Sequence, residues 1–193
     1  KLWRFWTVPR KGDPARATWA GDSADYGGSP TWTTGTYDVE TDTLFWTTGN
    51  PGPDYDGSRR AGDNLYSCSL LALDPDTGKM KWHYQFTPND PYDYDAVQIP
   101  VLADITMNGT PTKAMLWANR NGFFYVLNRE TGKFLLGKPF VKVNWASGID
   151  MATGRPIHTP MTAEVRKTEE QKDPIEVWPS AYGGKNWMPM SFD

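Results

Sequence analysis

The turn that decides the fold reads Ala72-Leu73-Asp74-Pro75-Asp76-Thr77-Gly78-Lys79-Met80-Lys81-Trp82. A second copy follows as Val126-Leu127-Asn128-Arg129-Glu130-Thr131-Gly132-Lys133-Phe134, and a weaker third copy is Gly148-Ile149-Asp150-Met151-Ala152-Thr153-Gly154-Arg155. A turn that recurs in this way predicts similar stacked sheets, each covering the apolar face of the next. We interpret Trp3 and Trp82, which stand at the end of this pattern, as residues that pack between neighbouring sheets.

Short strands joined by tight turns are expected along the rest of the chain. No segment shows a sustained 3.6-residue apolar period, so we predict an all-β fold. Asn108-Gly109 is a strong signal for a two-residue hairpin. The 10 Trp, 9 Tyr, 8 Phe, 18 Gly and 16 Pro agree with many short strands and turns. The expected strands are 31–37, 43–48, 65–73, 80–86, 99–104, 112–118, 122–127 and 134–136.

Composition excludes several classes of function. A net charge of -3 gives no basic surface for nucleic acid, and no apolar run approaches the length of a membrane span. The single cysteine, Cys68, excludes an internal disulfide and a cysteine-based zinc site, and we interpret it as a buried, inert thiol. His83 and His158 have no neighbouring nucleophile pattern, which argues against hydrolase chemistry. Because the chain opens on Lys1 with no initiator Met, we expect it to be a fragment of a longer protein.

The chemistry-bearing stretch is Thr87-Pro88-Asn89-Asp90-Pro91-Tyr92-Asp93-Tyr94-Asp95. Asp93 and Asp95 are separated by one residue, so in an extended chain their carboxylates point to the same side. Two like charges on one side repel unless a cation or a shared proton holds them. Hard oxygen ligands of this kind suit calcium or a lanthanide. The alternative is an Asp-rich turn that faces solvent.

Together with this stretch, further motifs resemble the quinoprotein alcohol dehydrogenases, the methanol and ethanol dehydrogenase family that uses pyrroloquinoline quinone (PQQ). The resemblance spans nearly the whole chain, in the family's order and at its approximate spacing. The motifs are Gly27-Gly28-Ser29-Pro30-Thr31-Trp32, Trp46-Thr47-Thr48-Gly49-Asn50-Pro51-Gly52-Pro53, the Thr87 to Asp95 stretch, Asn119-Arg120-Asn121-Gly122-Phe123-Phe124-Tyr125 and Pro179-Ser180-Ala181-Tyr182-Gly183-Gly184-Lys185-Asn186-Trp187.

The resemblance implies an eight-bladed β-propeller with tryptophan-docking repeats, with the cofactor and a metal ion at its centre. At roughly 40–50 residues per blade, the chain is expected to supply about four blades. We treat residues 1–193 as one partial propeller domain with no internal boundary. The implied activity is oxidation of a primary alcohol to the aldehyde by hydride transfer to metal-bound PQQ, with electrons passed to cytochrome c. The implied location is the periplasm, and a homodimer is one expected assembly.

The resemblance also implies which residues contact the cofactor. Trp32 matches the indole on which PQQ lies, although another core tryptophan is the alternative. Arg120 matches an arginine that hydrogen-bonds the quinone oxygens, the alternative being an ordinary cation beside a hairpin. Asn186 matches a residue that contacts the cofactor, and Trp187 is expected to line the cavity.

The expected metal ligands are Asn50, Asp93 and Asp95. Asn50 matches the family's ligating amide, although an asparagine before proline also initiates turns. Asp93 matches the catalytic aspartate, which removes the hydroxyl proton of the alcohol. Asp95 resembles the extra carboxylate of lanthanide-dependent members, whereas calcium-dependent members commonly carry a small neutral residue there. Because a trivalent ion gains more Coulomb energy from an added anion than a divalent ion does, we favour a lanthanide over calcium.

A non-catalytic propeller is the alternative function. Scaffolds of the outer-membrane assembly type share the Asp-x-x-Thr-Gly turn and bind no cofactor, but they have no physical need for Asn50, Asp93 and Arg120. A sugar-binding propeller uses aromatic residues without paired aspartates. The resemblance places a ligating glutamate before Lys1 and substrate-pocket residues after Asp193, so the isolated segment is predicted to be inactive.

Overall fold

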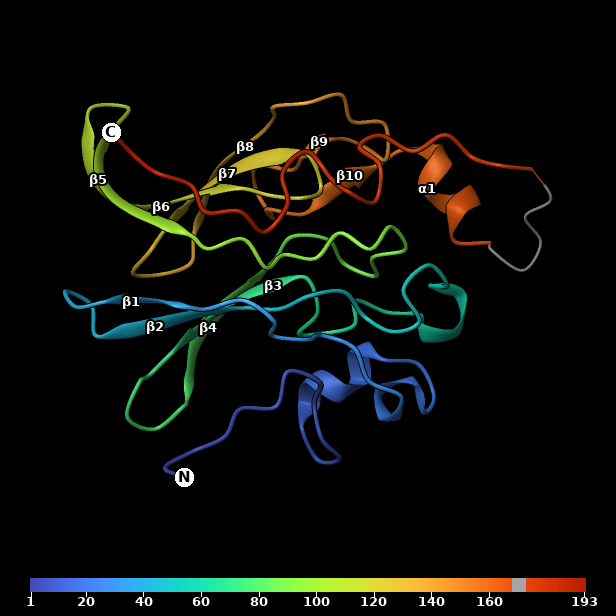
Figure 1. Cartoon of the computed structure of the whole chain (residues 1–193), viewed down its shortest axis with the longest axis horizontal. Coiled ribbons are helices and arrows are strands. Elements are labelled where there is room, and N and C mark those ends of the chain that lie inside the picture. The colour runs from blue at the N-terminus through green and yellow to red at the C-terminus, as the bar shows by residue number, and fades with distance from the viewer. Residues whose placement is uncertain (168–172) are drawn as a thin grey trace.

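The computed structural model describes residues 1–167 and 173–193. Its strands form two four-stranded antiparallel sheets, in the orders β1-β2-β3-β4 and β5-β6-β7-β8, and a two-stranded sheet of β9 and β10 (Figure 1). The strands are β1 (Thr36–Asp38), β2 (Thr43–Thr47), β3 (Ser69–Leu73), β4 (Met80–Gln85), β5 (Val101–Met107), β6 (Thr110–Ala118), β7 (Phe123–Asn128), β8 (Phe134–Pro139), β9 (Ala146–Ile149) and β10 (Pro156–His158). Short 3-10 helices lie at Pro14–Thr18, Ser23–Asp25 and Ser58–Arg60, and α1 is Pro160–Val165.

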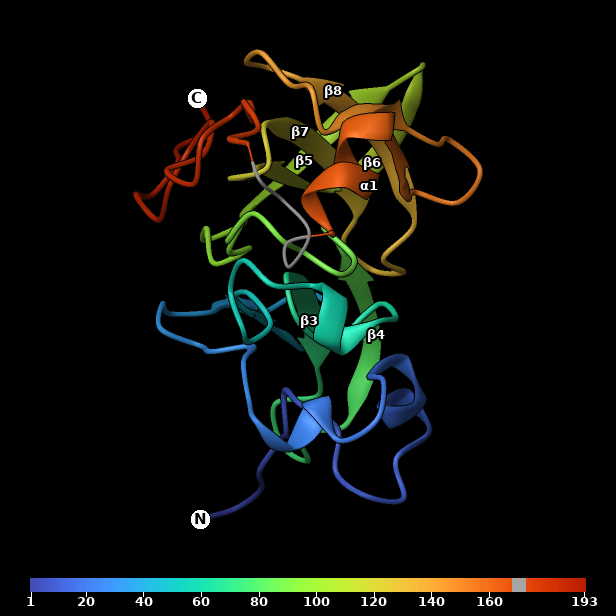
Figure 2. The same ribbon diagram turned by 90° about the vertical axis from the view of Figure 1, so that its right-hand side faces the viewer.

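In each four-stranded sheet, strands adjacent in sequence are also adjacent in space, which is the topology of a propeller blade. Figures 1 and 2 show the same order from two directions: the N-terminal segment lies at one end, the β1–β4 sheet follows, and the β5–β8 sheet lies at the other end. The predicted all-β propeller fold is therefore confirmed, with little helix among the described residues. No helix in this part of the chain has the length and apolarity to cross a bilayer.

The two blades share one aromatic core. Phe86, just after β4, packs against Trp117 of β6 and Tyr125 of β7, with ring centroids 4.7 and 4.8 Å apart. All three side chains are at most 1% exposed. β3 is buried at every residue because it is an inner strand of its sheet and both of its faces are covered. Burial of large aromatic side chains is the main favourable contribution to this packing.

The recurring turn joins the blades as the sequence predicts. The Trp3 indole N–H donates to the Pro75 carbonyl oxygen at 2.7 Å, and the Trp82 indole N–H donates to the Glu130 carbonyl oxygen at 3.1 Å. Gly78 and Gly132 lie under the two indole rings with φ of +70° and +74°, and a Cβ at either glycine would overlap the ring. The structural role predicted for the two tryptophans is confirmed.

Several expected boundaries are wrong. The strand predicted at 31–37 forms only at Thr36–Asp38, and the one predicted at 65–73 begins at Ser69 because Asn64 and Cys68 have positive φ and turn the chain. The estimate of about four blades is too high, since the described residues form two complete blades and one strand pair. Residues 1–35, 159–167 and 173–193 contain no strand, so dividing the chain length by a typical blade length overestimates the number of blades.

The hairpin at Asn108-Gly109 is confirmed, with φ of +50° and +78° between β5 and β6. Cys68 is fully buried as predicted. Burial and the neighbouring carboxylate of Asp90 raise the pKa of its thiol well above the usual value, so it stays protonated. The assignment of residues 1–193 to one domain stays a prediction.

Candidate active site

The candidate site forms where the loops after β2, β4 and β6 meet. Arg120, in the β6–β7 turn, contacts both aspartates of the β4–β5 loop: its Nη1 lies 3.0 Å from Asp95 Oδ2 and its Nη2 lies 3.4 Å from Asp93 Oδ2. The Arg120 and Asp95 side chains are each 9% exposed, and the Asp93 side chain is 22% exposed. A partly buried guanidinium between two carboxylates is a strong charge-assisted contact.

The reason predicted for the proximity of the two aspartates is wrong. Asp93 has φ of +62°, so the chain is not extended at this point and strand alternation does not place its side chain. Arg120 instead holds the two carboxylates together. A positive φ at a residue other than glycine is uncommon and costs backbone energy, which tertiary contacts must offset.

Asp95 is fixed by contacts from several directions. Its Oδ1 accepts the backbone N–H of Asn50 at 2.7 Å, and its Oδ2 accepts the indole N–H of Trp32 at 3.3 Å in addition to the Arg120 contact. A Cβ at Gly49 would collide with Asp95 Oδ1, so only glycine permits this approach. The motif containing Asn50 thus shapes the carboxylate position through its backbone.

Arg120 is itself held by the C-terminal motif. Its Nε donates to the Ala181 carbonyl oxygen at 2.7 Å, and its own carbonyl oxygen accepts the Gly184 N–H at 2.9 Å. Gly183 has φ of +80°, and a Cβ there would overlap the Arg120 side chain. The paired glycines of this motif therefore allow its backbone to approach the arginine closely.

Negative charge is in excess around Arg120. Burial raises the pKa of Asp93 to about 6, with further increases from Asp95 and Asp54, while Arg120 and a hydrogen bond from Tyr55 lower it. Burial also raises the pKa of Asp95, and Asp54 adds to the increase. With three carboxylates near one guanidinium, a bound cation would stabilise the ionised forms.

The predicted metal ligands fit a hard cation by donor type but supply only part of a coordination shell. Asn50 lies against this cluster, with its Nδ2 donating to Asp54 Oδ1 at 2.6 Å. Asn50, Asp93 and Asp95 offer amide and carboxylate oxygens, whereas calcium takes roughly six to eight oxygen ligands. Within residues 1–167 and 173–193, no three His, Cys, Asp or Glu side chains are arranged to hold a metal ion.

The predicted cofactor residues divide into two groups. Trp32 lies against Asp95 and is 47% exposed, so part of its indole is accessible beside the carboxylate cluster. Asn186 and Trp187 make local contacts: Asn186 Nδ2 donates to the Tyr182 carbonyl oxygen at 3.4 Å, and Asn186 Oδ1 accepts the Trp187 N–H at 2.9 Å. The structure joins Trp32 to the carboxylate cluster, but these local contacts do not join the other two to it.

Sequence reasoning missed Asp54 and Tyr55. Both perturb Asp93, the first by its charge and the second by a side-chain hydrogen bond. The available signal was their position directly after the Asn50-Pro51-Gly52-Pro53 turn, where an acid and a tyrosine follow a predicted ligand.

Comparison with known proteins identifies the family. The model of the glucose/ethanol/alcohol dehydrogenase β-propeller domain matches residues 1–145. The blades, the docked tryptophans and the clustered acids are on the matching segment. The chain belongs to the family of PQQ-dependent alcohol dehydrogenases.

Individual relatives agree with this assignment. The chain is 44% identical to quinohemoprotein alcohol dehydrogenase ADH IIB of Pseudomonas putida over 99% of its length, and 39% identical to the lanthanide-dependent methanol dehydrogenase of Methylacidiphilum fumariolicum over 95%. It superposes on the solved quinohemoprotein alcohol dehydrogenase of Comamonas testosteroni with a TM-score of 0.88, at 44% identity and over all of this chain. The chain spans only 29%, 30% and 30% of these three proteins, respectively.

Proposed function

We propose that the protein oxidises a primary alcohol of the methanol and ethanol class to the aldehyde, with PQQ as the electron acceptor and one bound metal ion. The observation that carries the proposal is the Arg120 contact with Asp93 and Asp95 beside the half-exposed indole of Trp32. A propeller scaffold without a cofactor has no need for this cluster of buried charge, whose formation costs desolvation energy.

Asp93 is the proposed general base. It accepts the hydroxyl proton of the alcohol on a carboxylate whose pKa of about 6 leaves it ionised at neutral pH. Arg120 holds this carboxylate in place and balances part of its charge. When bound, PQQ supplies a two-electron acceptor and the metal ion supplies a Lewis acid. Trp32 would support the face of the planar cofactor, with Asn186 and Trp187 proposed as further contacts.

A lanthanide is the favoured metal. Asn50, Asp93 and Asp95 are the proposed ligands, and the second carboxylate suits a trivalent ion better than a divalent one. One relative is named a lanthanide-dependent methanol dehydrogenase, which supports this choice. Calcium is the alternative metal.

The remaining parts of the proposal come from the family resemblance. Electrons pass to cytochrome c, and the protein acts in the periplasm. Association into a homodimer is a further prediction, which gel filtration coupled to light scattering would test.

The proposal is tested with the full-length gene product, stripped of metal and reconstituted with PQQ. Dye-linked alcohol oxidation is measured with lanthanum and with calcium in the wild type, Asp95→Ala and Asp95→Asn. We expect lanthanum activity in the wild type and a loss of at least about tenfold in both variants, because one ligand charge is removed. Asp95→Asn is the sharper variant, since Asp95→Ala also removes the contacts to Arg120 and the Asn50 N–H.

The other outcomes separate the alternatives. Activity with calcium alone would keep the enzyme assignment and contradict the lanthanide. Neither alcohol oxidation nor PQQ binding under either metal would support the scaffold function instead. Asp93→Asn is the reference variant, because loss of the base should abolish activity with both metals.

A further inference from the structure

Asp90, in the loop between β4 and β5, is a fully buried acid to which the proposed function gives no role. Its Oδ1 accepts the backbone N–H of Tyr92 at 2.9 Å, and its Oδ2 accepts the backbone N–H of Tyr94 at 2.7 Å. The Cys68 thiol is a third donor, with its Sγ 3.4 Å from Asp90 Oδ2. One carboxylate therefore holds the backbone on both sides of Asp93.

The charge of Asp90 suits this bonding. Burial raises its pKa to about 6, while the two backbone N–H groups and the charge of Arg60 oppose the rise, so the carboxylate is ionised at neutral pH. An ionised carboxylate accepts hydrogen bonds at both oxygens, whereas an amide of the same shape accepts at one oxygen only. The cost of burying the charge is offset only if both oxygens keep their donors.

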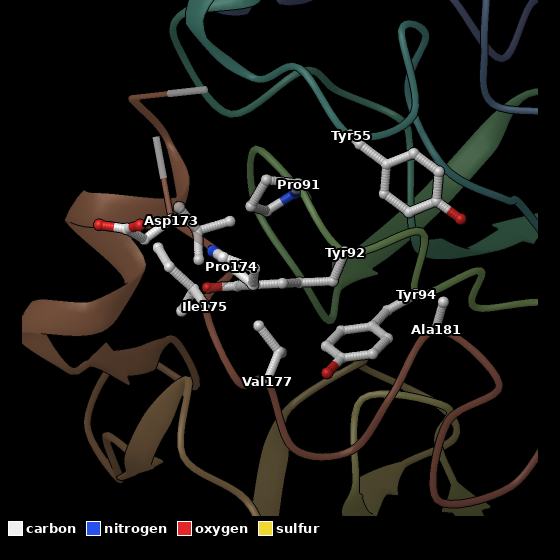
Figure 3. Close-up of a pocket in the computed structure, with 10 residues that line it drawn as sticks. Tyr55, Pro91, Tyr92, Tyr94, Asp173, Pro174, Ile175, Val177 and Ala181 are labelled. Atoms are coloured by element: carbon white, nitrogen blue, oxygen red, sulfur yellow. The ribbon is translucent and has the colours of Figure 1, made fainter. Parts of the chain in front are cut away.

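The side chains of Tyr92 and Tyr94 restrict the same segment further. Their rings lie 5.0 Å apart, and Figure 3 shows both rings extending from this loop toward the segment after residue 172. The Tyr92 hydroxyl donates to Thr162 Oγ1 at 3.0 Å. The Tyr94 hydroxyl donates to the Pro179 carbonyl oxygen. Both neighbours of Asp93 are thus fixed through backbone and side chain, and Asp93 between them has its left-handed φ of +62°.

Arg60 joins Asp90 to the loop that follows Asn50. Its side chain is fully buried. Its Nη2 donates to the Asp90 carbonyl oxygen at 2.6 Å and to the Pro53 carbonyl oxygen at 3.0 Å. The carbonyl oxygen of Asp54 lies 3.4 Å from the same nitrogen. One guanidinium therefore fixes the loop after a proposed metal ligand relative to the loop of the proposed base.

We propose that Asp90 is a positioning residue for Asp93, acting through the two N–H groups that flank Asp93 and through Arg60. The inference rests on the proposed function and adds to it. The hydrogen bonds to Asp90 offset the backbone energy of the left-handed conformation. They thereby keep the Asp93 carboxylate 3.4 Å from Arg120 Nη2. A displacement of about 1 Å at a reacting group can lower a rate roughly 10²-fold.

The test uses the full-length gene product reconstituted with PQQ and the metal ion that supports its activity. kcat per bound PQQ and KM for ethanol are measured in the wild type, Asp90→Asn and Arg60→Lys. We expect Asp90→Asn to lower kcat about tenfold or more and to change KM less than about twofold, because its amide nitrogen faces a backbone N–H and one bond is lost. Arg60→Lys keeps the charge without the planar set of donors and should lower kcat about threefold to tenfold.

Asp38→Asn is the matched control. Asp38 is also buried, and its Oδ1 accepts the backbone N–H of Glu40, two residues ahead, at 3.1 Å, but it lies at the end of β1 outside the site. This variant should lower the free energy of unfolding and leave kcat per bound PQQ unchanged.

The remaining outcomes separate the positioning role from the proposed function. An unchanged kcat per bound PQQ in Asp90→Asn, or a loss no larger than that of Asp38→Asn, would overturn the positioning role while the alcohol dehydrogenase function stands. If Asp90→Asn does not fold, Arg60→Lys decides, and an unchanged kcat there overturns the role. Absence of alcohol oxidation in the wild type would overturn the proposed function itself.

Discussion

Arg120 determines the geometry of the candidate site at the scale of single residues. It contacts Asp93 and Asp95 through separate nitrogens and is anchored through its third nitrogen to Ala181. A lysine carries one ammonium group and cannot reproduce this planar arrangement of donors. The relative position of the two carboxylates therefore depends on the guanidinium itself.

Tyr55 is predicted to act as a positioning residue for Asp93. Tyr55→Phe removes the hydroxyl group that hydrogen-bonds Asp93 but keeps the aromatic ring. We expect kcat to fall about threefold to tenfold, the equivalent of roughly 0.5–1.5 kcal/mol for one hydrogen bond.

Steady-state alcohol oxidation kinetics of the full-length gene product check this prediction. Tyr55→Ala is the comparison variant, since it removes the ring as well as the hydroxyl group and should lower kcat at least as much as Tyr55→Phe does. An unchanged kcat in Tyr55→Phe would contradict a positioning role.

The sequence motifs indicated five residues that the structure brings together at this site, namely Trp32, Asn50, Asp93, Asp95 and Arg120. The contacts among these residues could not be predicted from the sequence. The positive φ of Asp93 has no sequence signal as clear as a glycine, and contacts such as Tyr55 with Asp93 depend on loops that meet only in the folded chain. Asn186 and Trp187 stay predictions.

At the scale of elements, the Asp-x-x-Thr-Gly turn provides the surface on which an indole ring packs. In the turn after β3, Asp74 Oδ1 accepts the backbone N–H groups of Asp76 and Thr77 and the Thr77 hydroxyl. These bonds fix the shape of the turn, on whose glycine the ring of the preceding repeat docks. The structure explains why the glycine at the end of the motif admits no side chain.

We predict that Gly132→Ala destabilises the protein by roughly 2–4 kcal/mol, from a left-handed backbone conformation and overlap with the Trp82 ring. The matched control is Gly109→Ala, because Gly109 also has a positive φ of +78° but no atom near its missing Cβ. The control should lose only about 1–2 kcal/mol. Urea unfolding of both variants measures the difference. Equal losses of unfolding free energy would contradict the packing of the Trp82 ring on Gly132.

His83 of β4 is predicted to make the fold sensitive to acid. Burial lowers its pKa below the usual 6.5, and its ring packs edge-on against Tyr66 at 4.9 Å. Because the folded-state pKa lies below the unfolded one, the stabilising contribution is complete above about pH 6.5 and is lost as the pH falls below that value.

His83→Phe keeps a ring in this position without a titrating group. Its free energy of unfolding should fall less than that of the wild type when the pH is lowered from 7.5 to 5.0, as measured by urea titrations at each pH. Parallel pH profiles for the two proteins would rule out His83 as the source.

Strand positions were predictable where the residues of a short turn determine its conformation by themselves. The Asn108-Gly109 hairpin and the strands around the repeated turns lie close to their expected positions. The largest errors fall at 31–35 and 65–68, where the chain lies in loops outside the sheets. Tertiary contacts override strand propensity at those positions.

At the scale of the whole molecule, Arg129 forms an ion pair between the two blades. It follows β7 of the second blade, and its Nε lies 2.9 Å from Asp38 Oδ2 at the end of β1 in the first blade. Other nitrogens contact Glu40 at 2.9 Å and Asp104 at 2.5 Å. The guanidinium is nearly buried, so these contacts are poorly screened by salt.

We predict that Arg129→Met lowers the free energy of unfolding by about 3 kcal/mol, because the buried carboxylate of Asp38 loses its cationic partner. Lys113→Met is the control, since Lys113 pairs with Glu40 at 3.1 Å at an exposed position and should contribute less than about 1 kcal/mol. Denaturant unfolding at low and high salt checks both values. A similar small loss for the two variants would contradict the role of Arg129.

The docked tryptophans also have a consequence for biosynthesis. Trp3 precedes its acceptor carbonyl at Pro75 by 72 residues, and Trp82 precedes Glu130 by 48 residues. At a synthesis rate of roughly 5–20 residues per second, each indole emerges from the ribosome several seconds before the turn that will receive it. The aromatic surface of each indole therefore has no partner until the turn that receives it has been translated.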